Sequence, residues 1–111
     1  MIRRITNFKK SDEFRSQIHQ LIPGGAHTYS KGDDQFPERS PAAIDYGKGS
    51  HVWDIDGNEF IDFCCSWGPL ILGHNHPKVF TGVVEAMKNG ASFGAPTVLE
   101  NELAELILSR N

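Results

Sequence analysis

The residue types that could do chemistry in this chain are its lysines, two closely spaced histidines and a tryptophan that follows a predicted hairpin. A lysine amine becomes a nucleophile or a base where burial destabilises its charged form. Five of the six lysines have polar neighbours on predicted helix surfaces, turns or tails, so we interpret them as solvated: Lys9, Lys10, Lys48, Lys78 and Lys88. Lys31 differs because it lies in a long irregular segment, and such segments carry both functional groups and solvated charge.

His74 and His76 are two residues apart, so in an extended segment both side chains would face one side and could bind a metal ion. Zinc sites need three or four ligands, and no cysteine or acidic residue completes a set in this stretch. We therefore expect structural or helix-capping histidines and no metal site.

These groups must be positioned by a small number of elements. The first is a helix over roughly residues 11–21, which Ser11 or Asp12 could cap and which Pro23-Gly24-Gly25 would end. Its apolar residues recur at helical spacing: Phe14, Ile18 and Leu21. Residues 26–43 then show little periodicity, and a loop of this length in a compact domain is usually functional or held by a partner.

The clearest local pattern predicts a small antiparallel β-meander. Its strand-like runs lie at residues 43–46, 51–55 and 59–63. Gly47-Lys48-Gly49 forms a turn between the first two runs, and alternation in the second places Trp53 and Ile55 on one face. Asp56-Gly57 is a strong signal for a type I′ hairpin turn, in which both central residues have positive φ.

Two helices are expected after the meander. Pro77 is a favourable first helical residue, Gly90 would end that helix, and Thr97 with Glu100 matches a capping box for the next. Both helices carry apolar stripes, made by Val79, Phe80, Val83, Val84 and Met87 in the first and by Leu99, Leu103, Leu106 and Ile107 in the second. Because two helices and a meander bury little together, we expect these stripes to need a partner and the isolated chain to self-associate or aggregate.

Composition and charge exclude several classes of protein. The chain of 111 residues is 39% hydrophobic and 23% charged, which is typical of a globular domain, and its net charge of −3 argues against a nucleic-acid partner. No apolar run approaches membrane-spanning length, and no secretory signal is visible, so no membrane partner is expected. Neighbouring cysteines rarely form a disulfide with each other, so Cys64 and Cys65 are expected to be free thiols. Free thiols fit a reducing, cytoplasmic location.

Three stretches together resemble one enzyme family. They are residues 22–25 (Ile-Pro-Gly-Gly), residues 49–77 with the Trp-Asp-Ile-Asp-Gly-Asn hairpin, Ser-Trp-Gly-Pro and Gly-His-Asn-His-Pro, and residues 92–105 beginning Ser-Phe-Gly-Ala-Pro. Their order and spacing look like the N-terminal part of class-III pyridoxal-phosphate-dependent aminotransferases of the glutamate-1-semialdehyde 2,1-aminomutase type. The resemblance covers about residues 20–110, nearly the whole chain.

The resemblance implies an α+β fragment of a fold-type-I pyridoxal-phosphate-dependent transferase, with an N-terminal helix, a small antiparallel β-meander and then two helices. It places residues 1–72 in the N-terminal segment of the small domain and residues 73–111 in the first helices of the large domain, which binds pyridoxal 5′-phosphate. In this family the Schiff-base lysine, the aspartate facing the pyridine nitrogen and the phosphate-binding loop lie further along the chain. We therefore expect a family member with no catalytic residue of its own, without the main cofactor-binding residues, and inactive alone.

The residues present would belong to the substrate side of the active site. By resemblance, Trp67 forms an aromatic wall beside the substrate and Thr28 provides a small hydroxyl near it; the alternatives are a core tryptophan and a polar loop residue. Lys31 lies where semialdehyde aminomutases carry an arginine that holds the substrate carboxylate. A lysine gives a point charge in place of a bidentate pair, so the substrate would differ, unless Lys31 is only an exposed loop lysine.

The loop formed by Ser92, Phe93, Gly94 and Ala95 would, by resemblance, reach into the neighbouring subunit's active site, which implies a homodimer. Its backbone N–H groups precede a helix N-terminus and could face an anion; the alternative is a loop held only by glycine and proline chemistry. The sequence thus predicts part of an aminotransferase that moves an amino group to or from a small carbonyl substrate. The alternatives are glutamate-1-semialdehyde 2,1-aminomutase proper, in tetrapyrrole synthesis, and a non-enzymatic dimerisation or interaction module.

Overall fold

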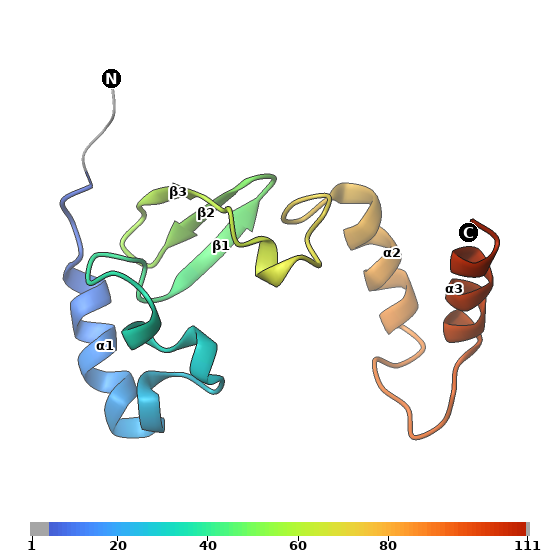
Figure 1. The fold of residues 1–111 in the computed structure, drawn as a ribbon, viewed down its shortest axis with the longest axis horizontal. Helices are drawn as coiled ribbons and strands as arrows, with labels where there is room; N and C mark the ends of the chain where they lie inside the picture. The colour runs from blue at the N-terminus through green and yellow to red at the C-terminus, as the bar shows by residue number, and fades with distance from the viewer. Residues whose placement is uncertain (1–4, 111) are drawn as a thin grey trace. The chain divides into compact units, whose positions relative to one another are not determined.

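A computed structural model of the chain describes residues 5–110 and divides into two compact units, Met1–His76 and Pro77–Asn111 (Figure 1). The first unit contains helix α1 (Lys9–Leu21), followed by short 3₁₀ turns at Pro23–Gly25, Tyr29–Lys31 and Asp33–Gln35. Strands β1 (Ile44–Lys48), β2 (His51–Asp54) and β3 (Glu59–Ile61) then form an antiparallel sheet in the order β1-β2-β3, and a further turn covers Cys65–Trp67. The predicted helix and meander are confirmed, but Gly47 and Lys48, which were expected in the turn, belong to β1 and pair with Val52 and His51.

Helix α1 is capped from a distant part of the chain. It begins at Lys9, and neither Ser11 nor Asp12 caps it, so that prediction was wrong. The carboxylate of Asp56, on the turn between β2 and β3, accepts the backbone N–H groups of Lys10 at 2.8 Å and Ser11 at 2.9 Å. These are first-turn N–H groups without partners inside the helix, and a carboxylate also favours the positive end of the helix dipole.

The register of the sheet determines which face of β2 is buried. Tyr46 lies opposite Trp53, and their rings stack with centroids 4.6 Å apart. The predicted alternation is present, but the most buried residues of β2 are Val52, at 8% exposure, and Asp54, at 1%. The face that carries Trp53 is only half-buried.

The hairpin turn between β2 and β3 differs from the predicted type I′ turn. Gly57 has a φ of 78°, whereas Asp56 keeps a negative φ. The N–H of Gly57 donates to the carbonyl of Asp54 at 2.9 Å. The buried carboxylate of Asp54 accepts the N–H groups of Asp56 at 3.0 Å and Asn58 at 2.7 Å, and the side-chain amide of Asn58 at 2.9 Å. The turn is therefore built around the Asp54 carboxylate, with one left-handed glycine.

The second unit contains α2 (Pro77–Met87) and α3 (Val98–Leu108), joined by a loop (Figure 1). Helix α2 begins at Pro77 as predicted, and Gly90, with φ 111°, follows its end. Thr97 occupies the position before α3, but its side chain makes no capping hydrogen bond, so the capping box is absent. Neither helix has a buried residue. None of the helices within residues 5–110 combines the length and hydropathy that crossing a membrane requires.

Candidate functional site

Two of the predicted site residues line the same pocket. Lys31 and Trp67 both border a cavity of about 660 Å³ in the first unit, and the Nζ atom of Lys31 lies 5.8 Å from the centroid of the Trp67 ring. An ammonium group over an indole face is attracted by the ring quadrupole. Much of the remaining wall is apolar and includes Phe36, Pro41, Ile44, Val52, Phe60 and Phe63. A cationic group beside an aromatic and apolar wall suits a small molecule that carries one anionic group.

The backbone at and before Trp67 has an unusual left-handed conformation. Cys65, Ser66 and Trp67 have φ values of 47°, 55° and 60°, and Gly68 follows with 107°. The N–H of Trp67 donates to the carbonyl of Cys64 at 2.8 Å, and that of Gly68 to the carbonyl of Cys65 at 3.0 Å. Trp67 is 56% exposed, so it is not a core tryptophan of this unit.

Asp62 and His74 also line the pocket, although neither was predicted from the sequence to be a site residue. Asp62 Oδ1 accepts the N–H groups of Cys64 and Cys65 at 2.9 and 3.1 Å, and its Oδ2 lies 2.7 Å from Nε2 of His74. The hydrogen bond from His74 lowers the pKa of Asp62; burial opposes the shift, and the two backbone N–H groups add to it. An aspartate two residues before a turn is the sequence signal that indicates this capping role.

Thr28 was expected near the substrate, but the loop that carries it and Lys31 places it away from the pocket. The N–H of Lys31 donates to the carbonyl of Thr28 at 2.9 Å, which closes the short turn Tyr29–Lys31. Both side chains are exposed, and Lys31 lines the pocket whereas Thr28 does not. The structure therefore brings together Lys31 and Trp67 but not Thr28.

The loop between α2 and α3 carries the other predicted site residues, Ser92, Phe93, Gly94 and Ala95, and all four are exposed. The Phe93 ring packs against Gly90, where an added Cβ would lie 2.7 Å from the ring Cζ. A glycine is needed there both for this close approach and for its positive φ.

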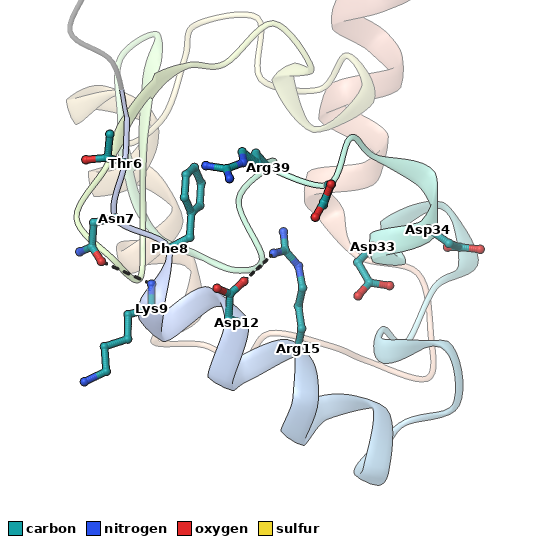
Figure 2. A pocket seen from close by; sticks show the side chains of 10 residues that line it. Thr6, Asn7, Phe8, Lys9, Asp12, Arg15, Asp33, Asp34 and Arg39 are labelled. Atoms are coloured by element: carbon teal, nitrogen blue, oxygen red, sulfur yellow. Dashed lines mark hydrogen bonds and ion pairs between the residues drawn. The ribbon is translucent and has the colours of Figure 1, made fainter.

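A larger cavity, of about 790 Å³, lies beside α1, and Figure 2 shows the charged side chains around it. Several of these charges already have partners. Arg15 pairs with Asp12 at 3.5 Å and donates to a carbonyl at 2.6 Å, Asp33 pairs with a histidine at 2.9 Å, and the Arg39 guanidinium lies 5.7 Å from the centroid of the Phe8 ring. None of the predicted site residues lines it, so the smaller pocket is the better candidate. Within residues 5–110 no group of three or more potential ligands is placed to hold a metal ion.

A family model for Aminotransferase class-III matches residues 31–110. The chain belongs to the class-III aminotransferase family. Among curated proteins of this family, it is 46% identical over 101 residues to a glutamate-1-semialdehyde 2,1-aminomutase of Fusobacterium nucleatum, covering 91% of the chain and 23% of that protein. It is 47% identical over 105 residues to glutamate-1-semialdehyde 2,1-aminomutase 1 of Staphylococcus aureus, covering 93% and 24%. The chain thus spans about a quarter of the length of these class-III aminotransferase relatives.

Solved structures give the same family fold. A transaminase with pyridoxal phosphate bound superposes with a TM-score of 0.81 at 33% identity, covering 96% of the chain and 24% of that structure. A β-phenylalanine aminotransferase from Variovorax paradoxus gives 0.75 at 28% identity, covering 92% and 23%. The architecture of this chain is therefore that of a part of a class-III aminotransferase, as the sequence predicts.

Proposed function

We propose that this chain is the substrate-facing N-terminal part of a pyridoxal-phosphate-dependent class-III aminotransferase that moves an amino group to or from a small carbonyl substrate. The observation that carries the proposal is the position of the Lys31 ammonium over the Trp67 ring at the wall of a largely apolar pocket. Lys31 would bind a substrate carboxylate as a point charge, and Trp67 would hold the substrate from one side. Thr28, on the same loop as Lys31, would contribute its hydroxyl after a small movement of that loop.

Pyridoxal 5′-phosphate supplies the electron sink for amino-group transfer when it is bound. Every lysine of the chain is exposed, so none has the desolvated environment that favours an uncharged amine. We therefore place the lysine and phosphate contacts of the cofactor in further sequence of a longer protein. The 23–24% coverage of the relatives and the exposed apolar side chains of α2 and α3 support this placement.

The proposal extends to the organisation of that longer protein. Residues 1–72 would belong to its small domain and residues 73–111 would begin its large domain. The exposed loop Ser92–Ala95 would approach the active site of a second subunit in a cytoplasmic homodimer. On its own the chain would then be inactive, because it would contribute only the substrate-facing wall.

The substrate distinguishes two candidate functions. The curated relatives named above favour glutamate-1-semialdehyde 2,1-aminomutase itself. Lys31, in the position where the resemblance places an arginine, favours a transaminase with another amino donor or acceptor, because a lysine lacks the bidentate grip on a carboxylate. We prefer the transaminase.

A chimera tests this proposal directly. The matching N-terminal quarter of the Staphylococcus aureus relative would be replaced by this chain, and transamination and aminomutase turnover would be measured on the purified, cofactor-loaded protein. We expect Trp67→Ala to lower kcat/KM at least about tenfold, the loss of about 1.4 kcal/mol of transition-state binding. The exposed strand residue Lys48 provides the control, and Lys48→Ala should leave kcat/KM unchanged.

The two candidate functions give different results for Lys31→Arg in this chimera. If Lys31 sets the substrate, this change raises aminomutase turnover relative to transamination. An unchanged ratio, with high aminomutase turnover before the substitution, would favour the aminomutase instead. A chimera that binds cofactor but is insensitive to changes at both Trp67 and Lys31 would contradict the proposed site.

The cofactor assignment has its own test on the chain itself. Pyridoxal phosphate would be added to the purified chain, and the product reduced with borohydride and analysed by mass spectrometry. We expect low, scattered modification of the exposed lysines. A stoichiometric adduct at one defined lysine would show that the chain contains the cofactor site after all.

A further inference from the structure

The backbone that carries Trp67 is held in a conformation that its residue types disfavour. Cys65, Ser66 and Trp67 all have φ between 47° and 60°, and Gly68 continues the left-handed run. Residues with a Cβ seldom adopt this region in succession, and they persist there only where neighbouring structure over-determines the backbone. A group outside the run must therefore stabilise it.

The carboxylate of Asp62 supplies this stabilisation at the start of the run. Its Oδ1 accepts the N–H groups of Cys64 at 2.9 Å and Cys65 at 3.1 Å. The carbonyl of Cys64 in turn accepts the N–H of Trp67 at 2.8 Å, and the carbonyl of Cys65 accepts that of Gly68 at 3.0 Å. The two residues whose N–H groups Asp62 binds are thus the same two whose carbonyls hold Trp67 and Gly68.

Asp62 is itself fixed to the sheet. Its N–H donates to the carbonyl of Ser50 at 2.8 Å, and its Oδ2 accepts from Nε2 of His74 at 2.7 Å. His74 exchanges two backbone hydrogen bonds with Gly49, at 2.8 and 2.9 Å, and its ring packs against Gly47, where a Cβ would lie 2.5 Å from Cγ of His74. The Asp62 side chain, at 14% exposure, cannot rotate without breaking contacts to the strands.

We propose that Asp62 is a positioning residue for the substrate-binding wall, acting through residues 64–68 to hold the Trp67 ring beside Lys31. This inference rests on the proposed function, because it assigns Trp67 to the substrate. The competing explanation is a general contribution of Asp62 to the stability of the unit. In that case its loss would disturb Trp53 on β2 as much as Trp67.

Fluorine NMR separates the two explanations because the chain contains two tryptophans. Labelling with 5-fluorotryptophan gives one resonance for each, and Trp53→Phe assigns them. We expect Asp62→Ala to move the Trp67 resonance toward its position in urea while the Trp53 resonance stays at its folded position. Asp62→Asn should keep both resonances in place, since its oxygen still accepts two N–H groups and its amide can donate to His74.

A matched control and a rescue sharpen the test. Asp56 also accepts two backbone N–H groups, but at α1, so Asp56→Ala should leave the Trp67 resonance in place. Adding Ser66→Gly to Asp62→Ala should return the Trp67 resonance toward its original position, because glycine adopts positive φ without steric cost.

Three results would overturn the positioning role. They are an unmoved Trp67 resonance in Asp62→Ala, an equal effect from Asp56→Ala, and equal displacement of both tryptophan resonances that Ser66→Gly does not reverse. The measurement needs no substrate, so a negative result leaves the proposed function standing. Conversely, an inactive chimera would leave the ordering of Trp67 by Asp62 intact.

Discussion

Replacing Asp54 by alanine should remove most of the stability of the first unit. The side chain is 1% exposed and accepts three hydrogen bonds, from the N–H groups of Asp56 and Asn58 and from the amide of Asn58. A hydrogen bond to a charged group contributes about 1.5–3 kcal/mol. Because water can reach some of the freed donors at the turn, we expect Asp54→Ala to cost about 3 kcal/mol in total.

That cost is large relative to the stability available. A unit spanning Met1–His76 is expected to have about 4–11 kcal/mol, from about 0.05–0.15 kcal/mol per residue. Val52, at 8% exposure, is the one buried hydrophobic side chain among the described residues, which places the unit at the low end of this range. A loss of about 3 kcal/mol would therefore be most of the stability of this unit.

The assay is a urea titration followed by far-UV circular dichroism and by tryptophan fluorescence in a Trp67→Phe background, which leaves Trp53, stacked on Tyr46, as the reporter. Trimethylamine N-oxide, which favours the folded state, would be added so that the baseline of the folded protein in the titration is long enough to fit. At an m-value of about 1 kcal/mol/M, the midpoint should fall by about 3 M. Asp45→Ala, at an exposed position of β1, is the control and should change stability by less than about 0.5 kcal/mol. A loss below about 1 kcal/mol for Asp54→Ala would refute the reasoning.

Further predictions concern neighbouring contacts. Because His74 lowers the pKa of Asp62 below 3.8, the stability contributed by Asp62 is present above pH 3.8 and lost as pH falls through the lower folded-state value. His74→Phe should raise the pKa of Asp62 toward 3.8 in a carboxyl NMR titration, and an unchanged value would contradict this cause. Asp56→Ala should speed amide exchange in the first turn of α1, and protection equal to the parent chain would argue against the cap. Gly47→Ala should cost about 1–3 kcal/mol in a thermal melt by pressing on His74, whereas Gly82→Ala, with open space around its Cβ, should raise helicity.

The sequence predicted the helices and strands well because the signals for them lie within a few neighbouring residues. The spacing of apolar residues and the proline at Pro77 were enough to predict α2, and β-propensity with short turns was enough to predict the meander. The resemblance assigned Lys31 and Trp67 separately to the substrate side, and no spacing rule predicts contact between residues so far apart in the chain. Only the structure shows that both line one pocket and that Thr28 does not.

The features that the sequence could not reveal depend on partners distant in the chain or on strain. Asp62 is hydrogen-bonded to His74, and no feature of the sequence indicates that these two side chains meet. The left-handed run through Cys65, Ser66 and Trp67 contains no glycine, asparagine or aspartate. The residue types that usually indicate a left-handed turn are therefore missing from it, and the sequence did not predict it. Asp54 is an acidic residue in an alternating strand pattern, and that pattern does not indicate that it is among the most buried residues or that its carboxylate caps the turn.

The cap that Asp56 provides for α1 has a consequence for how the protein is made. A chain grows from its N-terminus, so the residues of α1 leave the ribosome before the aspartate that caps them, which follows Lys10 by 46 positions. Closing a loop of this size has an entropic cost that local helix contacts do not offset. A helix of 13 residues is itself marginal in water. The nascent helix should therefore fluctuate until the hairpin has been synthesised, and the two should then become ordered in a single cooperative step.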